Sequence, residues 1–342
     1  MTVPLIRTLQ HHLPNTKVYW IISRPMYSLV QGLSNVEFIV LDKPKSLRDF
    51  WRCFRHFKSF HFDALLAPQA SLRSNFLCSM VRAKVTYGNG RLHSRDGQRL
   101  FVNKTVLAKQ EHLIDTFLRF AEPFGVTHKI IDWRLPIEQS DFDWAEQQLN
   151  SLSGKRFAVC LSASKAERNW PLDRYLKLLD RLARQWNFNV ILVGGGSPIE
   201  KQIAEQVASK LSMPHLNLMG KSTLKQLAAV LSRVDALLSP DTGPLHIATA
   251  MRIPVVGLYA VAPPEKTGPY FSQEWVVNRF PEAVRRILKR DPNKISWRKR
   301  VHSAQAMELI TVDDVEQKCV SLFSRLGFTP TESFHPGHQP KN

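Results

Sequence analysis

Short apolar runs alternate with amphipathic stretches along the first half of the chain. Four of these runs are rich in β-branched and aromatic residues, which is typical of β-strands. They occupy residues 17–22, 36–41, 62–66 and 83–87. Helical patterns precede and follow them at residues 3–12 and 112–120. Strands that alternate with helices in this way predict a doubly wound α/β domain.

The second half of the chain repeats this alternation, from Arg156 to about Arg290. Its strand-like apolar runs occupy residues 158–161, 190–193, 234–238 and 255–259. Residues 136–154, which join the two halves, are polar and acidic, and the helix predicted at 141–152 leads into a linker. The sequence therefore predicts a second α/β domain of similar construction.

These patterns divide the chain into four segments. They are an N-terminal α/β domain at 1–152, a second α/β domain at 153–310, a closing helix at 311–327 and a disordered tail at 328–342. Thr311 is expected to cap the closing helix, because Asp313 and Asp314 follow it in the first turn. The tail is assigned because it has no periodic apolar pattern after Phe334.

Length and cysteine content narrow the class of protein. A chain of 342 residues suits two domains. Its four cysteines have no metal-ligand spacing, so we expect reduced thiols in a cytoplasmic protein. No apolar run approaches the ~18 residues of a membrane-spanning helix, and the N-terminus lacks the apolar core of a signal peptide.

The charge is strongly positive, with 47 Lys and Arg against 29 Asp and Glu and a formal net charge of +18. Such an excess favours a polyanionic partner: nucleic acid, an anionic membrane surface or a phosphorylated glycolipid. A solvated positive surface without a partner is the alternative. We find no zinc-finger spacing, RNA-reading aromatic motif or basic-zipper heptads, so nucleic acid has the least support.

The most informative segment is the turn after the apolar run at 234–238, which reads Ser-Pro-Asp-Thr-Gly-Pro-Leu-His. Pro244 is tolerated in the first turn of a helix, and Asp241 or Thr242 can cap that helix. A helix that begins at the carboxyl end of a parallel strand suits an anion such as phosphate. The alternative is an ordinary capped turn. An aspartic protease is excluded, since it needs two Asp-Thr-Gly triplets in an all-β chain.

This turn, together with the strand at 255–259 and Thr-Gly-Pro-Tyr at 267–270, resembles the heptosyltransferase family, glycosyltransferase family 9. Three further motifs are similar to that family and occur in its order. They are residues 162–171, which end in Arg-Asn-Trp-Pro, the glycine-rich strand end at 190–196 with Glu200 on the next helix, and Leu-Met-Gly-Lys-Ser-Thr-Leu at 218–224.

The resemblance implies a GT-B fold, in which two Rossmann-like domains face each other across a cleft. It implies an inverting enzyme that moves heptose from ADP-heptose to the Kdo–lipid A region of lipopolysaccharide, at the cytoplasmic face of the inner membrane. No cofactor is implied, and the sequence shows no Asp-x-Asp loop for a divalent metal. The donor-binding residues that it implies are Ser164, Arg168, Glu200, Ser222, Asp241, Thr242, Gly243, Pro244 and His246.

Each of these positions has a simpler alternative. Arg168 stands where the family has Lys, which keeps the charge but changes its geometry, and the alternative is a surface arginine. Ser164 fits loop packing as well as phosphate binding. His246 fits a packed, backbone-bonded role, Asp241 fits a helix cap, and Glu200 and Ser222 fit a solvated helix and turn.

The start of the chain departs from the family. There, an apolar first strand leads into a Gly-Asp loop whose Asp is the proposed general base, whereas Met1–Arg7 matches the helix after that loop. We therefore expect the base and the first strand to lie upstream of Met1, through a misassigned start or a truncated gene. Loss of a central strand would expose the edges of its neighbours. The alternative function is a truncated, non-catalytic remnant that binds nucleotide or glycolipid.

Aromatic and basic residues are interleaved at 47–58. Helical spacing places Phe50, Trp51, Phe54 and Phe57 on one face and the bases Arg48, Arg52, Arg55 and Lys58 on others. Such a helix can lie on an anionic bilayer and hold the phosphorylated acceptor. Alternatively, it packs its aromatics on the sheet and leaves its bases in water. A second basic stretch, at 285–300, offers the same two interpretations.

Overall fold

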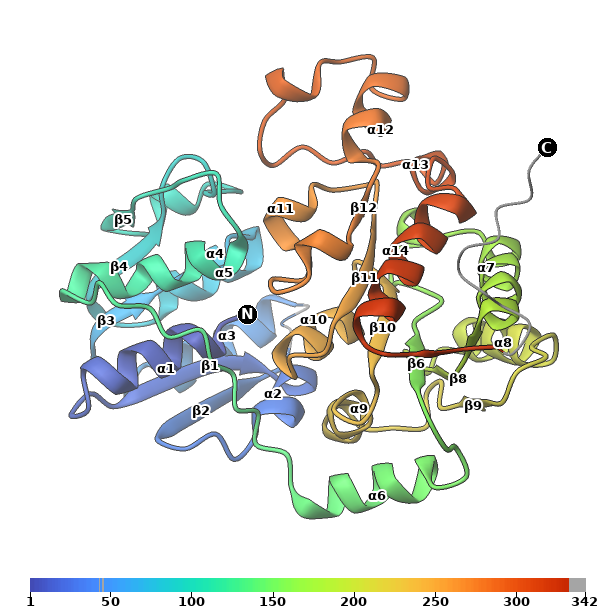
Figure 1. The fold of residues 1–342 in the computed structure, drawn as a ribbon. Helices are drawn as coiled ribbons and strands as arrows, with labels where there is room; N and C mark the ends of the chain where they lie inside the picture. The colour runs from blue at the N-terminus through green and yellow to red at the C-terminus, as the bar shows by residue number, and fades with distance from the viewer. Residues whose placement is uncertain (43, 45, 332–342) are drawn as a thin grey trace. The chain divides into compact units, whose positions relative to one another are not determined.

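A computed structural model describes residues 1–331, with the exception of residues 43 and 45. The chain forms two compact units, Met1–Pro136 and Ile137–Asn342 (Figure 1). The boundary between the two units lies one helix earlier than the expected boundary at 152. The reason is that helix α6 (Gln139–Leu149) is tied to unit 2: Glu138 pairs with Lys225 at 3.1 Å, and Glu146 with Arg233 at 2.7 Å.

Unit 1 alternates helices with parallel strands. The order is α1 (Val3–His12), β1 (Val18–Ser23), α2 (Arg24–Val30), β2 (Val36–Leu41), α3 (Leu47–Phe57), β3 (Phe62–Leu66), α4 (Leu72–Met80), β4 (Ala83–Asn89), η1 (Gln98–Leu100), β5 (Lys104–Val106), α5 (Leu113–Leu118) and η2 (Arg119–Phe124). Its strands form two separate parallel sheets, β1-β2 and β3-β4-β5. β1 and β3 are therefore edge strands.

One apolar cluster spans both sheets of unit 1. Ile21 from β1 and Phe62 from β3 pack against the buried side chains of Ile39 and Phe57. The ring of Tyr19 lies 5.3 Å from that of Phe62. The two sheets thus share side-chain packing without sharing main-chain hydrogen bonds.

Unit 2 is built around one continuous sheet. Its elements are α6, β6 (Arg156–Val159), η3 (Ala166–Arg168), α7 (Leu172–Gln185), β7 (Trp186–Asn187), β8 (Asn189–Leu192), α8 (Pro198–Ala208), β9 (His215–Asn217), α9 (Leu224–Leu231), β10 (Ala236–Pro240), α10 (Gly243–Ala250), β11 (Val255–Tyr259), α11 (Pro264–Thr267), η4 (Gln273–Trp275), β12 (Val277–Asn278), α12 (Phe280–Arg286), η5 (Pro292–Lys294), α13 (Gln305–Glu308), α14 (Val312–Arg325) and β13 (Thr329–Pro330). Six strands pair in the order β12-β11-β10-β6-β8-β9, and all are parallel. The predicted α/β class is confirmed.

The central strands of this sheet are buried on both faces. Alternate side chains point to opposite faces of a strand, and those of Phe157 and Val159 enter a cluster with helices α7, α8, α12 and α14. Helices α9 and α10 contact each other and contribute no side chain to this cluster (Figure 1). A sheet covered on both faces explains why its strands read as continuous apolar runs.

The end of the described chain is ordered. Phe328 is buried and stacks on Phe323 with ring centroids 3.9 Å apart, and Thr329–Pro330 pairs antiparallel with β7. The prediction of a disordered tail from residue 328 is therefore wrong for residues 328–331, because an aromatic contact and a short strand fix them. The rest of that prediction, 332–342, lies outside the described residues.

The model also bears on membrane insertion. Within residues 1–331, apart from 43 and 45, no helix combines the length and the hydropathy that a membrane span requires. Helix α14, one of the longest, carries charged residues in its first and last turns.

Candidate functional site

The turn between β10 and α10 is capped by Thr242. Its hydroxyl accepts a hydrogen bond from the Leu245 amide at 3.4 Å and contacts the Ser239 hydroxyl at 2.7 Å. Because Pro244 has no N–H, the Gly243 amide and the helix dipole are what remain for an anion. A Cβ added at Gly243 would meet no atom within 4 Å, so the space beside this amide is open.

Asp241 contacts two basic side chains instead of capping the helix. Its carboxylate lies 3.1 Å from Arg168 Nη1 and 3.5 Å from His246 Nε2, and its carbonyl accepts a second bond from Arg168 at 3.1 Å. Burial alone would raise the pKa of this carboxyl, but the surrounding basic side chains outweigh burial and hold its pKa below the ordinary value. They are His246, Arg168 and Arg300.

Arg168 is therefore no surface arginine. Only 15% of its side chain is exposed, and its Nε is buried without a hydrogen-bond partner among the described residues. A buried guanidinium N–H without an acceptor is costly. The Arg168 guanidinium is thus held at the start of α10, and its Nε–H can still donate a hydrogen bond.

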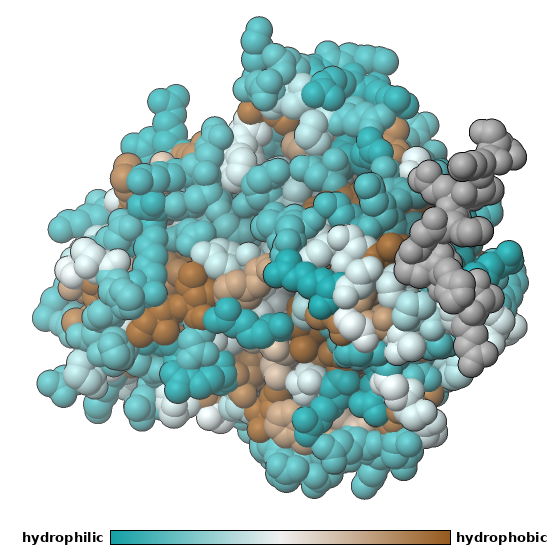
Figure 2. Space-filling model, viewed as in Figure 1, coloured by the Kyte–Doolittle hydropathy of each residue, from teal (hydrophilic) through white to brown (hydrophobic). Residues whose placement is uncertain are grey.

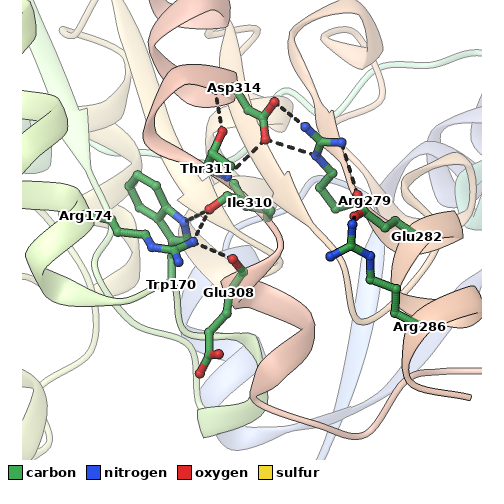
Figure 3. A network of polar contacts seen from close by, with 9 residues as sticks. All are labelled: Trp170, Arg174, Arg279, Glu282, Arg286, Glu308, Ile310, Thr311 and Asp314. Atoms are coloured by element: carbon green, nitrogen blue, oxygen red, sulfur yellow. Dashed lines mark hydrogen bonds and ion pairs between the residues drawn. The ribbon is translucent and has the colours of Figure 1, made fainter.

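The loop that carries Arg168 is fastened to the C-terminal segment, as Figure 3 shows. Trp170 is buried and donates its indole N–H to the Ile310 carbonyl at 2.9 Å. Arg174 donates to the carbonyls of Ile310 and Glu308. Ser164, on the same loop, is exposed. The Trp-Pro part of the motif is therefore structural, because Trp170 ties the loop to the C-terminal segment.

Glu200 closes the turn after β8. Its carboxylate accepts from the Ser197 amide at 3.1 Å and the Ser197 hydroxyl at 2.7 Å, which completes a capping box on α8. It also accepts from the Ser162 hydroxyl at 3.3 Å. Glu200 is thus a bound cap, not a freely solvated residue.

The turn after β9 approaches that loop closely. Gly220 has a φ of +66°, and a Cβ there would lie 2.5 Å from the Gly196 Cα. Both the conformation and the space require glycine. Ser222 follows in the same turn and is half-buried.

The predicted donor residues thus follow the carboxyl ends of four neighbouring strands, β10, β6, β8 and β9. Ligands of open parallel sheets bind at this edge. Contacts join Arg168, Asp241 and His246 into one cluster, and Ser162 to Glu200. Ser164 and Ser222 lie at the same edge, in the loops after β6 and β9. In the described part of the chain, no three His, Cys, Asp or Glu side chains are grouped to hold a metal.

One residue of this cluster escaped the sequence interpretation. Arg300 acts on Asp241 across a long separation in sequence. It comes from a stretch that we read only as a basic patch, and no local pattern distinguished it from its neighbours. The neighbouring Tyr259 is fully buried, and burial raises its pKa well above the ordinary value, so it stays a neutral phenol.

Comparisons with known proteins assign this chain to a family. The model of "Glycosyltransferase family 9 (heptosyltransferase)" matches residues 50–291. The chain belongs to this family. It is 33% identical to the lipopolysaccharide core heptosyltransferase OpsX of Haemophilus influenzae, over 93% of this chain and 92% of that protein. This glycosyltransferase therefore spans nearly the whole length of that relative.

Solved structures agree on the fold. A glycosyltransferase of family 9 from Veillonella parvula has a TM-score of 0.73 at 20% identity, and it covers 95% of this chain and 93% of its own. Escherichia coli heptosyltransferase WaaC with ADP has a TM-score of 0.66 at 19% identity, with coverages of 94% and 95%. The glycosyltransferase thus has the expected GT-B fold.

In unit 1, helix α3 divides its aromatics between two faces. Phe57 is fully buried, whereas 58% of Trp51 and 44% of Phe54 are exposed. The expectation that these rings share one face with Phe50 is wrong, because the core-facing side is set by Phe57 with the buried Cys53. Arg55 lies over the Trp51 ring at 4.8 Å.

The predicted bases of α3 all reach solvent. They are Arg48, Arg52, Arg55 and Lys58. Ser46 caps the helix, in a capping box with Asp49. The helix packs one apolar stripe inward and still presents two aromatics among its bases.

The carboxyl edge of the β3-β4-β5 sheet has a buried polar network that the sequence interpretation missed. Asn89 donates to the Pro68 carbonyl at 2.9 Å and to Gln98 Oε1 at 3.1 Å. Gln98 donates to the Ala67 carbonyl at 2.8 Å. These bonds hold the loops after β3 and β4 in fixed positions. The only signal in the sequence is Asn-Gly directly after a strand.

Proposed function

We propose that this glycosyltransferase moves heptose from ADP-heptose to the Kdo–lipid A region of the lipopolysaccharide inner core. The carrying observation is the Arg168–Asp241–His246 cluster at the start of α10, on the sheet edge where nucleotides bind. The names of its relatives supply the sugar and the acceptor: one is a lipopolysaccharide core heptosyltransferase, and another was solved with ADP.

The donor diphosphate would be held by protein groups alone. The Gly243 amide and the α10 dipole face the site where negative charge develops on the leaving phosphate. Arg168 adds positive charge and His246 adds an imidazole ring, and Asp241 keeps both in place. Such an arrangement takes over the task that a divalent metal performs in other transferases.

The transfer itself would proceed with inversion. The acceptor hydroxyl oxygen forms a bond to the anomeric carbon while the bond from that carbon to the phosphate oxygen breaks. The leaving electron pair stays on ADP, and the hydroxyl proton passes to a general base. We assign that base to none of the described residues.

The nucleoside would lie along the neighbouring turns. Glu200 and Ser222 follow β8 and β9, beside the diphosphate site after β10. A ribose hydroxyl that bonds to Glu200 has to share the carboxylate with Ser197 and Ser162. Ser164, exposed on the loop after β6, supplies a further hydroxyl at that edge.

The acceptor side would be supplied by α3. Arg48, Arg52, Arg55 and Lys58 can pair with phosphates of the acceptor or with an anionic leaflet. The exposed Trp51 and Phe54 suit the boundary between headgroups and acyl chains. We therefore propose peripheral binding at the cytoplasmic face of the inner membrane, without nucleic acid as a partner.

A second candidate is a binding protein without transfer activity. The observation that favours it is the divided sheet of unit 1, in which β1 and β3 share no hydrogen bonds. Edge strands present main-chain N–H and C=O groups without a strand partner. In this case ADP-heptose would bind at the same turn and remain intact.

The test is calorimetric titration with ADP, followed by a transfer assay with ADP-heptose and Kdo–lipid A. Arg168→Ala should weaken ADP binding about 10- to 100-fold, since a charged hydrogen bond is lost. Arg184→Ala is the matched control, because this exposed arginine pairs with Asp180, away from the donor-site turn. Equal ADP affinities in the two variants would refute the donor site, and ADP-heptose binding without transfer would select the second candidate.

A further inference from the structure

The C-terminal unit carries a second basic surface, which we call the basic segment, residues 285–299. It runs from the end of α12 through η5 and forms the orange projection beyond α12 in Figure 1. The same projection is mostly hydrophilic in Figure 2. Its exposed bases are Arg285, Arg286, Lys289, Arg290, Lys294, Arg298 and Lys299, against a single acid, Asp291.

The basic segment is ordered. Ile287, Leu288 and Ile295 pack against the main cluster of unit 2. Asp291 accepts from the Asn293 amide at 2.9 Å and starts the η5 turn. Directly after the segment, Val301 is fully buried and donates its amide to the Val261 carbonyl at 2.9 Å. The apolar residues face inward, so the bases are held outward on a fixed backbone.

Most of these charges are not neutralised by the protein. Within the described residues, Arg285, Lys289, Arg290, Lys294 and Lys299 have no ion-pair partner; in the same helix as Arg285, Arg286 pairs with Glu282 at 2.8 Å. Holding five like charges near one another is unfavourable without an external counter-charge.

The α7 side of unit 2 has the opposite character. Lys177 pairs with Asp173, Arg184 with Asp180, and Arg181 with both Asp313 and Glu316. The same fold thus balances its exposed cations on one surface and leaves them unbalanced on the basic segment. The imbalance is local, and the overall charge of +18 does not explain it.

A pocket of about 400 Å³ opens beside the basic segment. Asn278, Arg279, Pro281, Glu282, Arg285 and Arg286 line it. Arg279 is fixed there by a two-pronged pair with Asp314, as Figure 3 shows. Arg285 brings an unpaired guanidinium to the same walls. The pocket has room for a phosphate-bearing headgroup beside the exposed bases of the segment.

We propose that the basic segment binds the anionic surface of a lipid bilayer, so that unit 2 has a membrane contact of its own, separate from α3. The proposal rests on the proposed function, in which the acceptor is anchored in a membrane. Clusters of four to eight Lys and Arg residues are typical of such contacts. Nucleic acid is less favoured, because the only aromatic residue of the segment, Trp297, is half-buried and offers no stacking platform.

The experiment is co-sedimentation of the full chain with vesicles of phosphatidylethanolamine, with and without phosphatidylglycerol, at low and at high salt. The test variant reverses four charges: Lys289→Glu, Arg290→Glu, Lys294→Glu and Lys299→Glu. The matched control reverses three cations of the α7 and α8 region: Lys177→Glu, Arg184→Glu and Lys210→Glu. Each charge removed should cost about fivefold in partitioning, so the test variant should bind anionic vesicles at least about 100-fold more weakly.

The outcomes separate this proposal from the proposed function. We expect the control to bind like the original chain, salt to weaken binding, and vesicles without phosphatidylglycerol to bind poorly. Undiminished vesicle binding by the test variant, at an unchanged melting temperature, would overturn the proposal. So would an equal loss in the control, or a loss of duplex DNA binding that exceeds the loss of vesicle binding. A chain that binds vesicles but not ADP would refute the donor site alone.

Discussion

The two units solve the same packing problem to different degrees. Unit 2 has one six-stranded sheet whose central strands are buried on both faces. Unit 1 has two short sheets whose strands are mostly half-buried. Because buried apolar area is the main source of stability, unit 2 provides a rigid platform for the donor site. Unit 1 depends on smaller clusters and on polar bonds between loops.

The largest expected difference concerns one phenylalanine in each unit. Phe157→Ala removes a fully buried ring that contacts Phe188 and Phe323, and it should cost about 3–5 kcal/mol. Phe38→Ala in β2 removes a half-buried ring and should cost about 1–2 kcal/mol. Urea unfolding followed by circular dichroism measures both. Equal losses would mean that the two units are equally well packed.

The next comparison is between two paired carboxylates. Burial would raise the pKa of Asp314, but Arg279 and the Thr311 cap outweigh it and lower the pKa. Asp314→Asn should therefore cost about 1–3 kcal/mol at neutral pH. The stability that Asp314 contributes is present above its unfolded pKa of about 3.9. It is lost as the pH falls through the lower folded pKa, so variant and original should converge in acid.

Asp42 in unit 1 is the control for that prediction. Its pair with Arg24 also lowers its pKa, but both side chains lie in solvent. Exposed pairs contribute little, so thermal denaturation of Asp42→Asn should show no change from the original chain at neutral pH. A loss as large as that of Asp314→Asn would show that exposure does not govern these pairs.

A smaller effect is expected at two helix caps. Thr242→Ala and Ser46→Ala each remove a side chain that accepts an amide hydrogen bond at a helix start. Each should cost about 1 kcal/mol of stability. Only Thr242→Ala should also weaken ADP binding, since α10 is the proposed diphosphate site. If Ser46→Ala weakened ADP binding equally, nucleotide affinity would be following global stability instead.

A stability effect smaller than that of the helix caps is expected at Trp51. With 58% of the side chain exposed, Trp51→Ala should change the free energy of unfolding by less than about 0.5 kcal/mol. It should nevertheless reduce binding to anionic vesicles, because an interfacial aromatic is lost. Phe57→Ala, on the buried side of α3, should have the reverse profile. A Trp51 variant that bound vesicles as well as the original chain would remove α3 from the membrane contact.

The sequence was most informative where burial is complete. The strands of unit 2 were readable because both of their faces are apolar, and the turn at Thr242 because capping is local chemistry. The boundary between the units was less readable, since only distant ion pairs at Glu138 and Glu146 attach α6 to unit 2. The aromatic residues of α3 lie on two faces of the helix. Periodicity alone does not decide which of these rings packs against the sheet.

The candidate site shows the same limit. The sequence motifs predicted that Arg168, Asp241 and His246 lie at one sheet edge. They did not predict that Asp241 contacts the other two side chains. The contribution of Arg300 and the polar network around Asn89 and Gln98 depend on contacts between distant segments. Such contacts follow from the tertiary fold and leave no spacing in the chain.

The stacked rings of Phe323 and Phe328 have a practical consequence for handling the protein. A cut or fusion junction placed before Phe328 would strip one aromatic from the interior and leave β7 without its short partner. Purification tags should therefore be joined beyond Thr331. Digestion by a carboxypeptidase should slow when it reaches the short strand β13 and the stacked Phe328.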